Sequence, residues 1–234
     1  MRDLFLPNRC PGCGRFIRWD RLMCGDCQER LDDVSGKVCS VCGKLPCQGH
    51  EALIPERVAV VYRYEGKCRE AMLAFKYRRG VNFGELGAQR LAELLLQSGD
   101  AQKADIVTCV PMSGAKRRRR GYNQAEIIGR YLAKRLGKPF DGRLLTHAPT
   151  LTEHHRLGIE ERRENAEKSF YPSKKHRDIG GRSVILCDDI YTTGATINAC
   201  AGRLKEMGAK RVVACCVATT FSRKEKSGLA AQKA

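Results

Sequence analysis

Residues 184–196 (VILCDDIYTTGAT) constrain the fold of this chain more than any other segment. Residues 184–187 form a continuous apolar run, which is typical of a strand buried on both faces of a parallel sheet. We expect the strand to stop there and Asp188 to open a polar turn. Apolar residues then recur at helical spacing over residues 197–207. The segment therefore predicts a strand, a loop and the start of a helix.

The loop in this segment has the composition of a phosphate-binding turn. At a helix start, unpaired backbone N–H groups and the positive end of the helix dipole point at one place, where a phosphate dianion fits. Threonine hydroxyls add hydrogen-bond donors, and glycine lets the backbone approach closely. The residues that we expect to bind phosphate are Thr192, Thr193, Gly194, Ala195 and Thr196.

Two carboxylates, Asp188 and Asp189, directly precede this loop. Such a pair accepts hydrogen bonds from neighbouring ribose hydroxyls, either directly or through Mg²⁺. The alternative is that the carboxylates cap a turn and the threonines cap a helix. The whole string resembles the 5-phosphoribosyl 1-pyrophosphate (PRPP) signature of type I phosphoribosyltransferases, and this resemblance favours a ribose 5-phosphate site.

Paired cysteines near the N-terminus predict a structural metal site. The first group is Cys10, Cys13, Cys24 and Cys27, two CxxC pairs ten residues apart. Their spacing and the lack of an export signal favour a metal over disulfides. Structural zinc takes four tetrahedral ligands, thiolates among them. Because so short a segment has little apolar material, metal binding supplies its folding energy, about 10–16 kcal/mol in comparable small fingers.

A second group contains Cys39, Cys42, Cys47 and His50, and it matches a Cys3His zinc site. Two alternatives stay open, namely one interleaved site that shares both groups and a redox-active thiol cluster. The spacing favours zinc, as one or two ions. Six further cysteines lie in apolar surroundings and are predicted to be small core residues: Cys68, Cys109, Cys187, Cys200, Cys215 and Cys216.

From residue 53 onward, apolar runs alternate with segments of helical periodicity, a pattern typical of an α/β domain with parallel strands. Strands are predicted at residues 58–64, 104–110 and 211–219, and helices at residues 68–77, 84–97 and 122–136. In such sheets, ligands bind beyond the carboxyl ends of the strands, which is where Pro111 and Asp188 fall.

A cationic run follows the predicted strand at residues 104–110. Its members are Lys116, Arg117, Arg118, Arg119 and Arg120. Such runs are usually solvated faces or nucleic-acid patches. Because this run lies in the same layer as the phosphate loop, part of it alternatively faces a pyrophosphate, which suits the guanidinium fork. Arg119 and Arg120 are predicted to lie nearest the pocket, because they adjoin Gly121.

Length and composition are consistent with two domains. The chain has 234 residues, 42% of them hydrophobic, which is enough for a sizeable core and a small second unit. No apolar stretch reaches the roughly 20 residues of a membrane span. The start, MRDLFLPNRC, lacks the apolar centre of a signal peptide. We therefore expect a cytoplasmic protein that does not insert into membranes.

Several segments together resemble the ComF family of competence-associated, phosphoribosyltransferase-like proteins. They are the paired cysteines, FKYRRG at residues 75–80, RRGYNQ at 119–124, ERRENAEKSF at 161–170 and DDIYTTGAT at 188–196. The resemblance implies an α/β, type I phosphoribosyltransferase fold, a parallel sheet flanked by helices, with a small N-terminal zinc-binding domain. It also implies a link to uptake of single-stranded DNA during natural transformation. The expected division is a zinc-binding domain at residues 1–52, a phosphoribosyltransferase-like domain at 53–222 and a basic, flexible tail at 223–234.

Carried over by position, the resemblance assigns Asp188 and Asp189 to the ribose hydroxyls or magnesium. It assigns residues 192–196 to the 5-phosphate, and it places Met112 and Ser113 in the pyrophosphate loop. Residues 146–165 correspond to the mobile lid of phosphoribosyltransferases. Two positions depart from the family pattern: His50 stands where a cysteine is common, and Glu153 stands near a common glutamine.

Two functions remain open. As an enzyme, the protein transfers the phosphoribosyl group to a nitrogen nucleophile, and magnesium, Lys76 and Arg120 stabilise the departing pyrophosphate. As a non-catalytic protein, it senses PRPP or acts as an adaptor that holds single-stranded DNA or a DNA-processing partner. A net charge of +17 favours a polyanionic partner, with Lys116, Arg117, Arg118 and Arg119 as candidate contacts, although only 6% of the residues are aromatic and available for stacking on bases. Nothing in the sequence identifies the acceptor.

Overall fold

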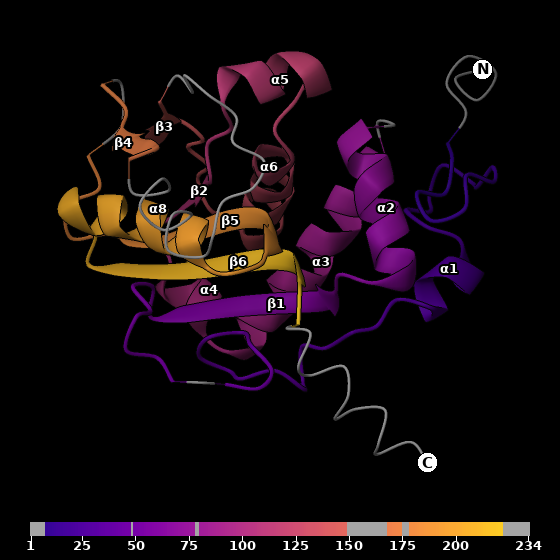
Figure 1. Ribbon diagram of the computed structural model, residues 1–234, viewed down its shortest axis with the longest axis horizontal. Coiled ribbons are helices and arrows are strands. Elements are labelled where there is room, and N and C mark those ends of the chain that lie inside the picture. The colour runs from indigo at the N-terminus through magenta and orange to yellow at the C-terminus, as the bar shows by residue number, and fades with distance from the viewer. Residues whose placement is uncertain (1–7, 48, 78–79, 149–167, 175–177, 222–234) are drawn as a thin grey trace.

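The computed structural model describes residues 8–47, 49–77, 80–148, 168–174 and 178–221. Its centre is a four-stranded sheet in the order β1-β6-β5-β2, in which all neighbouring strands are parallel (Figure 1). The strands are β1 (Arg57–Arg63), β2 (Ile106–Cys109), β5 (Ser183–Tyr191) and β6 (Arg211–Thr219). The predicted α/β fold with a parallel sheet is confirmed.

The two central strands, β5 and β6, are apolar on both faces because helices cover both sides of the sheet. Residues Val212 to Thr219 of β6 are all buried. The six cysteines predicted to be core residues are also all buried, which confirms that prediction.

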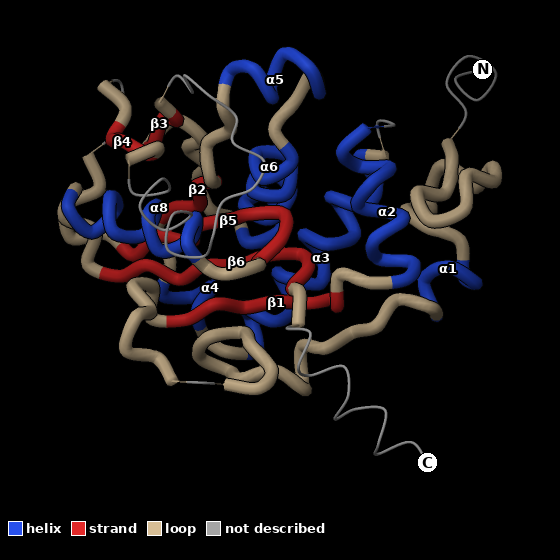
Figure 2. Tube along the Cα trace, in the orientation of Figure 1, coloured by secondary structure: helices blue, strands red, loops and turns tan. Residues whose placement is uncertain are grey.

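Helices cover both faces of the sheet. The helices α3 (Val81–Gln97) and α6 (Gln124–Leu136) pack against each other and against one face, and α8 (Ala195–Glu206) lies on the other (Figure 2). The helix α2 (Gly66–Tyr77) packs on α3, and the short α4 (Asp100–Lys103) follows α3. Gly87 permits close packing of α3, because a Cβ there would lie 2.5 Å from a methyl carbon of Val217 in β6.

Two sequence-based expectations about the loops were wrong. The strand β5 does not stop at Cys187 but continues through both aspartates to Tyr191, because β6 extends far enough to pair with it there. The neighbour on the other side, β2, already ends at Cys109. The cationic run is not a loop but a helix, α5 (Gly114–Arg120), with the Ser113 hydroxyl at its start and Gly121 at φ 82° after its end. It has no buried residue, so hydrophobic periodicity gave no signal.

The N-terminal segment divides into two parts that pack in different places. The first part, with α1 (Gly25–Glu29), lies beside α2 and α3, where Asn8 and Asn82 are hydrogen-bonded at 2.5 Å. The second part runs along the outer edge of β1, where the backbone N–H of Val34 and the carbonyl of Val41 bond to that strand. This segment therefore covers an edge that would otherwise expose unpaired backbone groups.

A small two-stranded antiparallel sheet of β3 (Leu145–His147) and β4 (Phe170–Pro172) packs on α8. Most of the predicted lid at residues 146–165 and the predicted tail at residues 223–234 lie outside the described residues. Within the described part of the chain, no helix is both long and apolar enough to cross a membrane.

Candidate functional site

A cleft of about 240 Å³ opens at the carboxyl ends of β2 and β5. We call it the carboxylate cleft, because Asp188 and Asp189 line it. The other predicted site residues that line it are Lys76, Met112, Ser113, Lys116, Arg120 and Thr196. These residues come from three segments far apart in the sequence that meet at one edge of the sheet, where parallel strands place their carboxyl ends.

The two carboxylates lie on consecutive residues of β5 and differ in their partners. Asp189 forms an ion pair with Lys76 at 3.1 Å. Asp188 accepts a hydrogen bond of 2.8 Å from the backbone N–H of Asp189. Burial and the neighbouring charge of Asp189 raise the pKa of Asp188 well above its ordinary value, despite the opposing charge of Lys76. This edge therefore favours binding of a cation or of hydroxyl donors.

Residues 192–196, which the sequence predicts to bind phosphate and which we call the phosphate loop, follow β5 and include the first two residues of α8. Gly194 is the N-cap of α8 and has φ 87°, a conformation that other residues rarely adopt. The hydroxyl of Thr193 accepts a bond of 3.4 Å from the N–H of Ala195, while Thr192 and Thr193 are exposed. Only Thr196 of this loop lines the carboxylate cleft, and the other four residues lie between it and the end of β5.

The cationic run contributes to the cleft unevenly. Lys116 and Arg120 line the cleft, one near each end of α5. Arg119 is exposed and does not line the cleft. The prediction that Arg119 and Arg120 lie nearest the pocket therefore agrees with the geometry for Arg120 and not for Arg119. Arg117 points to α6 and pairs with Glu126 at 3.2 Å. The reason is helical spacing, which separates the side chains of a continuous run onto different faces.

Arg120 is held over the cleft by residues that sequence reasoning did not select. Its guanidinium donates to Gln124 at 3.1 Å and lies 5.5 Å from the centre of the Tyr77 ring. Its Nε is buried and has no hydrogen-bond partner among the described residues. The buried Gln124 and Asn123 also bond to the carbonyls of Phe75 and Val110, at 3.4 and 2.9 Å. These buried amides fix the start of α6, and the RRGYNQ segment was the signal that could have identified them.

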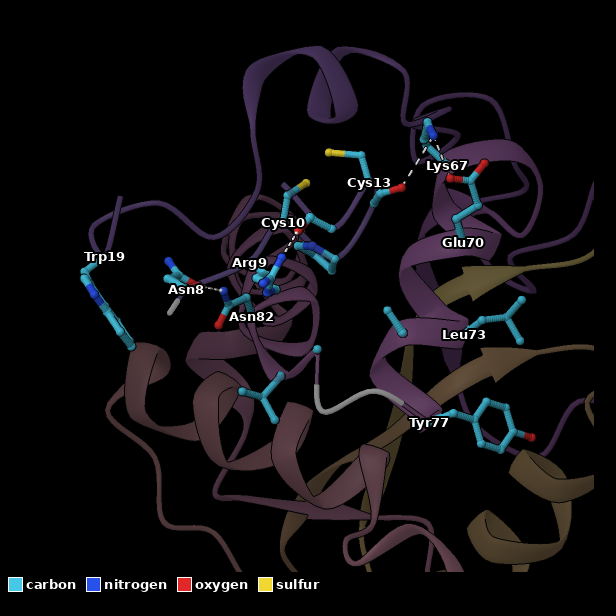
Figure 3. A pocket seen from close by; sticks show the side chains of 16 residues that line it. Asn8, Arg9, Cys10, Cys13, Trp19, Lys67, Glu70, Leu73, Tyr77 and Asn82 are labelled. Carbon is cyan, nitrogen blue, oxygen red and sulfur yellow. Dashed lines mark hydrogen bonds and ion pairs between the residues drawn. The ribbon is translucent and has the colours of Figure 1, made fainter. Parts of the chain in front are cut away.

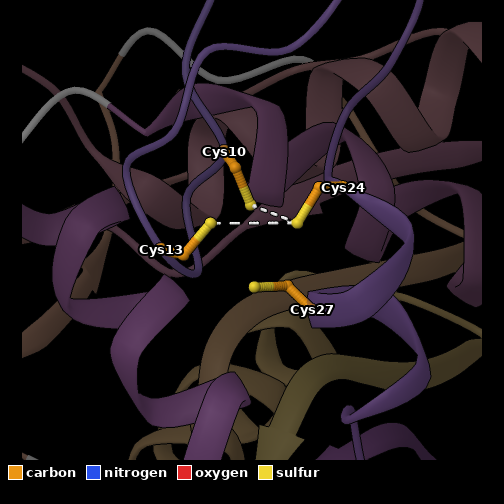
Figure 4. Close-up of side chains that lie close together, drawn as sticks. All are labelled: Cys10, Cys13, Cys24 and Cys27. Carbon is orange, nitrogen blue, oxygen red and sulfur yellow. Dashed lines mark hydrogen bonds between the residues drawn. The ribbon is translucent and has the colours of Figure 1, made fainter.

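The first cluster, Cys10, Cys13, Cys24 and Cys27, directs all four sulfur atoms toward a common centre (Figure 4). The Sγ atom of Cys24 lies 3.5 Å from that of Cys10 and 3.8 Å from that of Cys13. The backbone of Arg15 lowers the pKa of the Cys13 thiol to about 7, whereas burial raises those of Cys24 and Cys27. Cys13 is the exposed member of the group.

The second cluster, Cys39, Cys42, Cys47 and His50, is a separate group rather than part of an interleaved site. The Nε2 atom of His50 lies 3.2 Å from the Cys39 sulfur and 3.1 Å from the Cys47 sulfur. A backbone hydrogen bond from Cys42 lowers the pKa of Cys39 to about 6, and burial raises that of Cys42 to about 11. Cys47 and His50 are exposed.

Both clusters fit a tetrahedral zinc ion. In each, all four ligand atoms lie within 4.8 Å of one another. Zinc with bonds of about 2.3 Å to sulfur requires sulfur atoms roughly 3.8 Å apart, close to the separations found here. The first cluster offers four thiolates, and the second offers three thiolates and an imidazole. Both donor sets therefore suit zinc better than magnesium or calcium, which prefer oxygen.

A larger groove, about 1190 Å³, lies between the first cluster and helices α2 and α3. We call it the ribbon groove, and Figure 3 shows Trp19 and Tyr77 on opposite sides of it. Both rings are exposed, at 51% for Trp19 and 60% for Tyr77. Arg9 and Lys67 also line the groove, and Lys67 pairs with Glu70 at 2.6 Å. The groove was not anticipated, because its aromatic residues are isolated in the sequence.

Comparison with protein families gives two matches that together cover most of the chain. A double zinc ribbon domain matches residues 1–70, and a phosphoribosyl transferase domain matches residues 84–230. The first match, together with the two cysteine clusters, supports structural zinc in the N-terminal part.

Three relatives illustrate the similarity. The chain is 30% identical over 141 residues to "DNA utilization protein YhgH" of Salmonella typhimurium, covering 57% of this chain and 61% of the relative. It is 24% identical over 207 residues to "Competence protein ComFC" of Bacillus subtilis, covering 82% of each. It is 28% identical over 108 residues to "Competence protein F" of Haemophilus influenzae, covering 46% of this chain and 47% of the relative. The matches thus span less than two thirds of the first and third relatives.

Proposed function

This chain belongs to the phosphoribosyl transferase domain family and, within it, to the ComF proteins, and on that premise we propose that it binds PRPP with Mg²⁺ in the carboxylate cleft. One observation carries the proposal: an acidic pair, a phosphate loop and three cations meet at one edge of the sheet. The cations are Lys76, Lys116 and Arg120.

Different residues of the cleft suit the ribose hydroxyls, the 5-phosphate and the pyrophosphate of PRPP. Asp188 and Asp189 offer oxygen atoms to the ribose hydroxyls or to Mg²⁺, which prefers such ligands. The backbone N–H groups at the start of α8 and the hydroxyls of the phosphate loop suit the 5-phosphate. Met112 and Ser113, which follow β2, line the cleft together with Lys116 and Arg120, and this supports their assignment to the pyrophosphate. The buried Arg120 Nε, which has no hydrogen-bond partner in the described part of the chain, is the kind of donor that an anionic ligand satisfies.

Group transfer requires that negative charge on the leaving pyrophosphate be stabilised. When bound, Mg²⁺ supplies Lewis-acid stabilisation of the pyrophosphate oxygens. The guanidinium of Arg120, which Gln124 positions by a hydrogen bond of 3.1 Å, and the ammonium of Lys116 would add hydrogen bonds to the same oxygens. Asp189 would help to hold the Mg²⁺, and the ammonium of Lys76, which pairs with Asp189 at 3.1 Å, would offer a further positive charge to the anionic ligand.

Calorimetric titration of the zinc-loaded protein with PRPP and Mg²⁺ tests the binding site. We expect binding by the native chain and none by the Asp188→Asn/Asp189→Asn variant. The matched control is Asp20→Asn/Asp26→Asn, which removes two surface carboxylates that pair with Arg18 and Arg15. Equal affinities in the native chain and the first variant would overturn the assignment. Release of pyrophosphate on addition of candidate nitrogen acceptors separates an enzyme from a PRPP sensor.

A second candidate function, binding of single-stranded nucleic acid, is favoured by the ribbon groove. The relatives carry names that refer to competence and DNA utilization, and we infer a related cellular role for this chain. Exposed Trp19 and Tyr77 offer rings on which bases stack, and Arg9 and Lys67 offer charges to the backbone. The net charge of +17 also favours a polyanion.

Fluorescence anisotropy with a labelled oligothymidine distinguishes this groove from α5 as the binding surface. The Trp19→Ala/Tyr77→Ala variant should bind more weakly by about 1–3 kcal/mol per stacked base. Arg9→Gln/Lys67→Gln should lower the salt slope by about 0.7 for each phosphate contact that is lost. Arg117→Gln/Arg118→Gln on α5 is the charge-matched control, and a larger loss in that variant would move the site to α5.

A further inference from the structure

The second cluster lies next to the phosphate loop, although the two are far apart in the sequence. Lys44 is in the turn between Cys42 and Cys47, and its Nζ donates a hydrogen bond to the carbonyl oxygen of Thr192, 148 positions away. The same ammonium lies 4.2 Å from the centre of the Tyr191 ring. Thr192 is the first residue of the phosphate loop, so the metal-binding turn contacts the loop where it begins.

The chain that leaves the second cluster contacts the other end of the loop. The Asn198 side chain accepts a hydrogen bond of 3.1 Å from the N–H of Ile54 and donates one of 2.8 Å to the carbonyl of Ala52. These two residues follow His50 closely in the sequence. Asn198 belongs to the first turn of α8, and its backbone N–H bonds to the carbonyl of Gly194 at 2.8 Å. Both ends of the loop are therefore attached to the segment that carries the second cluster.

The second cluster itself is fixed to the sheet. The N–H of Val58 in β1 donates to the carbonyl of Val41 at 2.7 Å. Gly43 has φ 65°, and a Cβ there would lie 2.8 Å from the carbonyl oxygen of Val58. The turn that carries Lys44 is thus packed directly on the backbone of β1. The position of Lys44 relative to Thr192 therefore depends on the conformation of this turn.

We propose that the second cluster is a metal-dependent clamp on the phosphate loop, with Lys44 as its positioning residue. Its ligands include two sulfur atoms only 3.6 Å apart, which repel each other as thiolates unless a cation lies between them. Zinc bound by Cys39, Cys42, Cys47 and His50 keeps the turn closed and Lys44 on Thr192. Loss of the metal releases both attachments and leaves the loop less ordered.

The clamp predicts an effect confined to one end of the ligand. Its consequence for binding rests on the proposed function, in which residues 192–196 hold the 5-phosphate and the pyrophosphate lies at the opposite end of the cleft. Loosening the loop should weaken binding of ribose 5-phosphate and leave binding of Mg²⁺ pyrophosphate unchanged. A general loss of structure weakens both ligands, so the ratio of the two affinities separates positioning from folding.

Hydrogen exchange on the full chain tests the clamp without any ligand. The variants are Lys44→Met, which keeps all four metal ligands, and His50→Ala, which removes one. We expect faster amide exchange over residues 192–198 in both variants, and unchanged zinc content in Lys44→Met. The matched control is Lys37→Met, because Lys37 lies in the same segment but pairs with Asp32 at 3.3 Å. Unchanged exchange over residues 192–198 in both test variants would overturn the clamp.

Calorimetry with ribose 5-phosphate and with Mg²⁺ pyrophosphate gives the second readout. Lys44→Met should weaken ribose 5-phosphate about ten-fold, the loss typical of one hydrogen bond from a charged donor. Lys44→Arg, which keeps a cationic donor, should recover most of the affinity. Equal weakening of both ligands in Lys44→Met argues against positioning. If the native chain binds neither ligand, the proposed function fails, while hydrogen exchange still decides on the clamp.

Discussion

The first and second cysteine clusters have similar ligands but pack against different parts of the molecule. In the first, Cys10, Cys24 and Cys27 are buried and join the hydrophobic core with Met23. In the second, Cys42 is the buried ligand, and Cys47 and His50 are exposed. The first lies beside α2 and α3, whereas the second lies at the edge of β1 and reaches the phosphate loop.

This difference teaches how one type of metal site can serve two purposes. A metal whose ligands are part of the core is held by the packing around it, so its loss disrupts that packing. A metal whose ligands are exposed exchanges with solvent more readily, and its loss changes mainly what its turn contacts. We therefore expect the first cluster to determine stability and the second to determine the order of the phosphate loop.

The largest expected effect comes from removing a buried ligand of the first cluster. Cys24→Ser should lose one zinc ion per chain and unfold the segment that carries the first cluster, because metal binding supplies about 10–16 kcal/mol in comparable small fingers. Zinc analysis and limited proteolysis of the N-terminal segment measure the two effects. Cys200→Ala, a core cysteine outside both clusters, should keep the native zinc content. Native zinc content in Cys24→Ser would remove the basis of the comparison.

The order of metal release should distinguish the clusters next. On addition of a chelator, we expect a fast phase from the exposed second cluster and a slow phase from the buried first cluster. Release is followed with a zinc-sensitive dye. His50→Ala should abolish the fast phase alone, and Cys24→Ser the slow phase alone. A single phase in the native protein would show that burial does not separate the two sites.

The pH dependence of thiol reactivity sharpens the contrast further. After the fast phase, Cys39 is free of metal while Cys13 remains bound to zinc. Because the Cys39 pKa is lowered to about 6, its thiolate fraction and alkylation rate should rise with pH and be half-maximal near pH 6. Mass spectrometry after iodoacetamide pulses measures the rate at each cysteine. A midpoint near pH 8.5, roughly that of a free thiol, would mean that the backbone bonds do not persist without the metal.

The smallest expected effect concerns Asp188 in the carboxylate cleft. Burial raises the pKa of Asp188, so the folded state keeps a proton that the unfolded chain has lost, and stability falls as pH rises through the raised pKa. Asp188→Asn avoids this loss and still accepts the bond from Asp189. Above the raised pKa, we expect a Tm higher by about 2–4 °C, the shift produced by 1 kcal/mol in a domain of this size.

Thermal unfolding at several pH values checks this prediction. The gain should disappear at low pH, where Asp188 is protonated in both the folded and the unfolded state. Asp178→Asn, which removes an exposed carboxylate, serves as the control and should show no such dependence on pH. A lower Tm in Asp188→Asn at high pH would show that ionisation of Asp188 does not destabilise the folded state.

Much of the fold followed from local sequence patterns, and the errors have physical causes. Apolar runs predicted the buried strands, and helical periodicity predicted α3 and α6 to within a few residues. The end of β5 was misplaced, because whether polar residues continue a strand depends on the length of its neighbour β6. The helix α5 was missed, because it buries nothing and carries no periodic signal.

For the candidate site, residue chemistry was predictable and side-chain direction was not. The acidic pair and Lys76 were identified from the sequence, and the structure brings them into one cleft. Arg120 lines the cleft, whereas Arg119, which was predicted to lie beside it, does not, because adjacency to a glycine does not reveal the helical face. Lys116, a candidate nucleic-acid contact in a run that alternatively faces a pyrophosphate, lines the cleft.

The sequence by itself identified the eight candidate metal ligands and the loop that follows the acidic pair, because those features depend on spacing along a short stretch of chain, whereas the tertiary structure separated the ligands into two clusters. Only the tertiary structure decided that Lys44 reaches Thr192 and that the first cluster joins the core. Contacts between residues 148 positions apart depend on the order of strands in the sheet and on what covers its edges. Those choices are made by packing of the whole domain, and no local pattern encodes them.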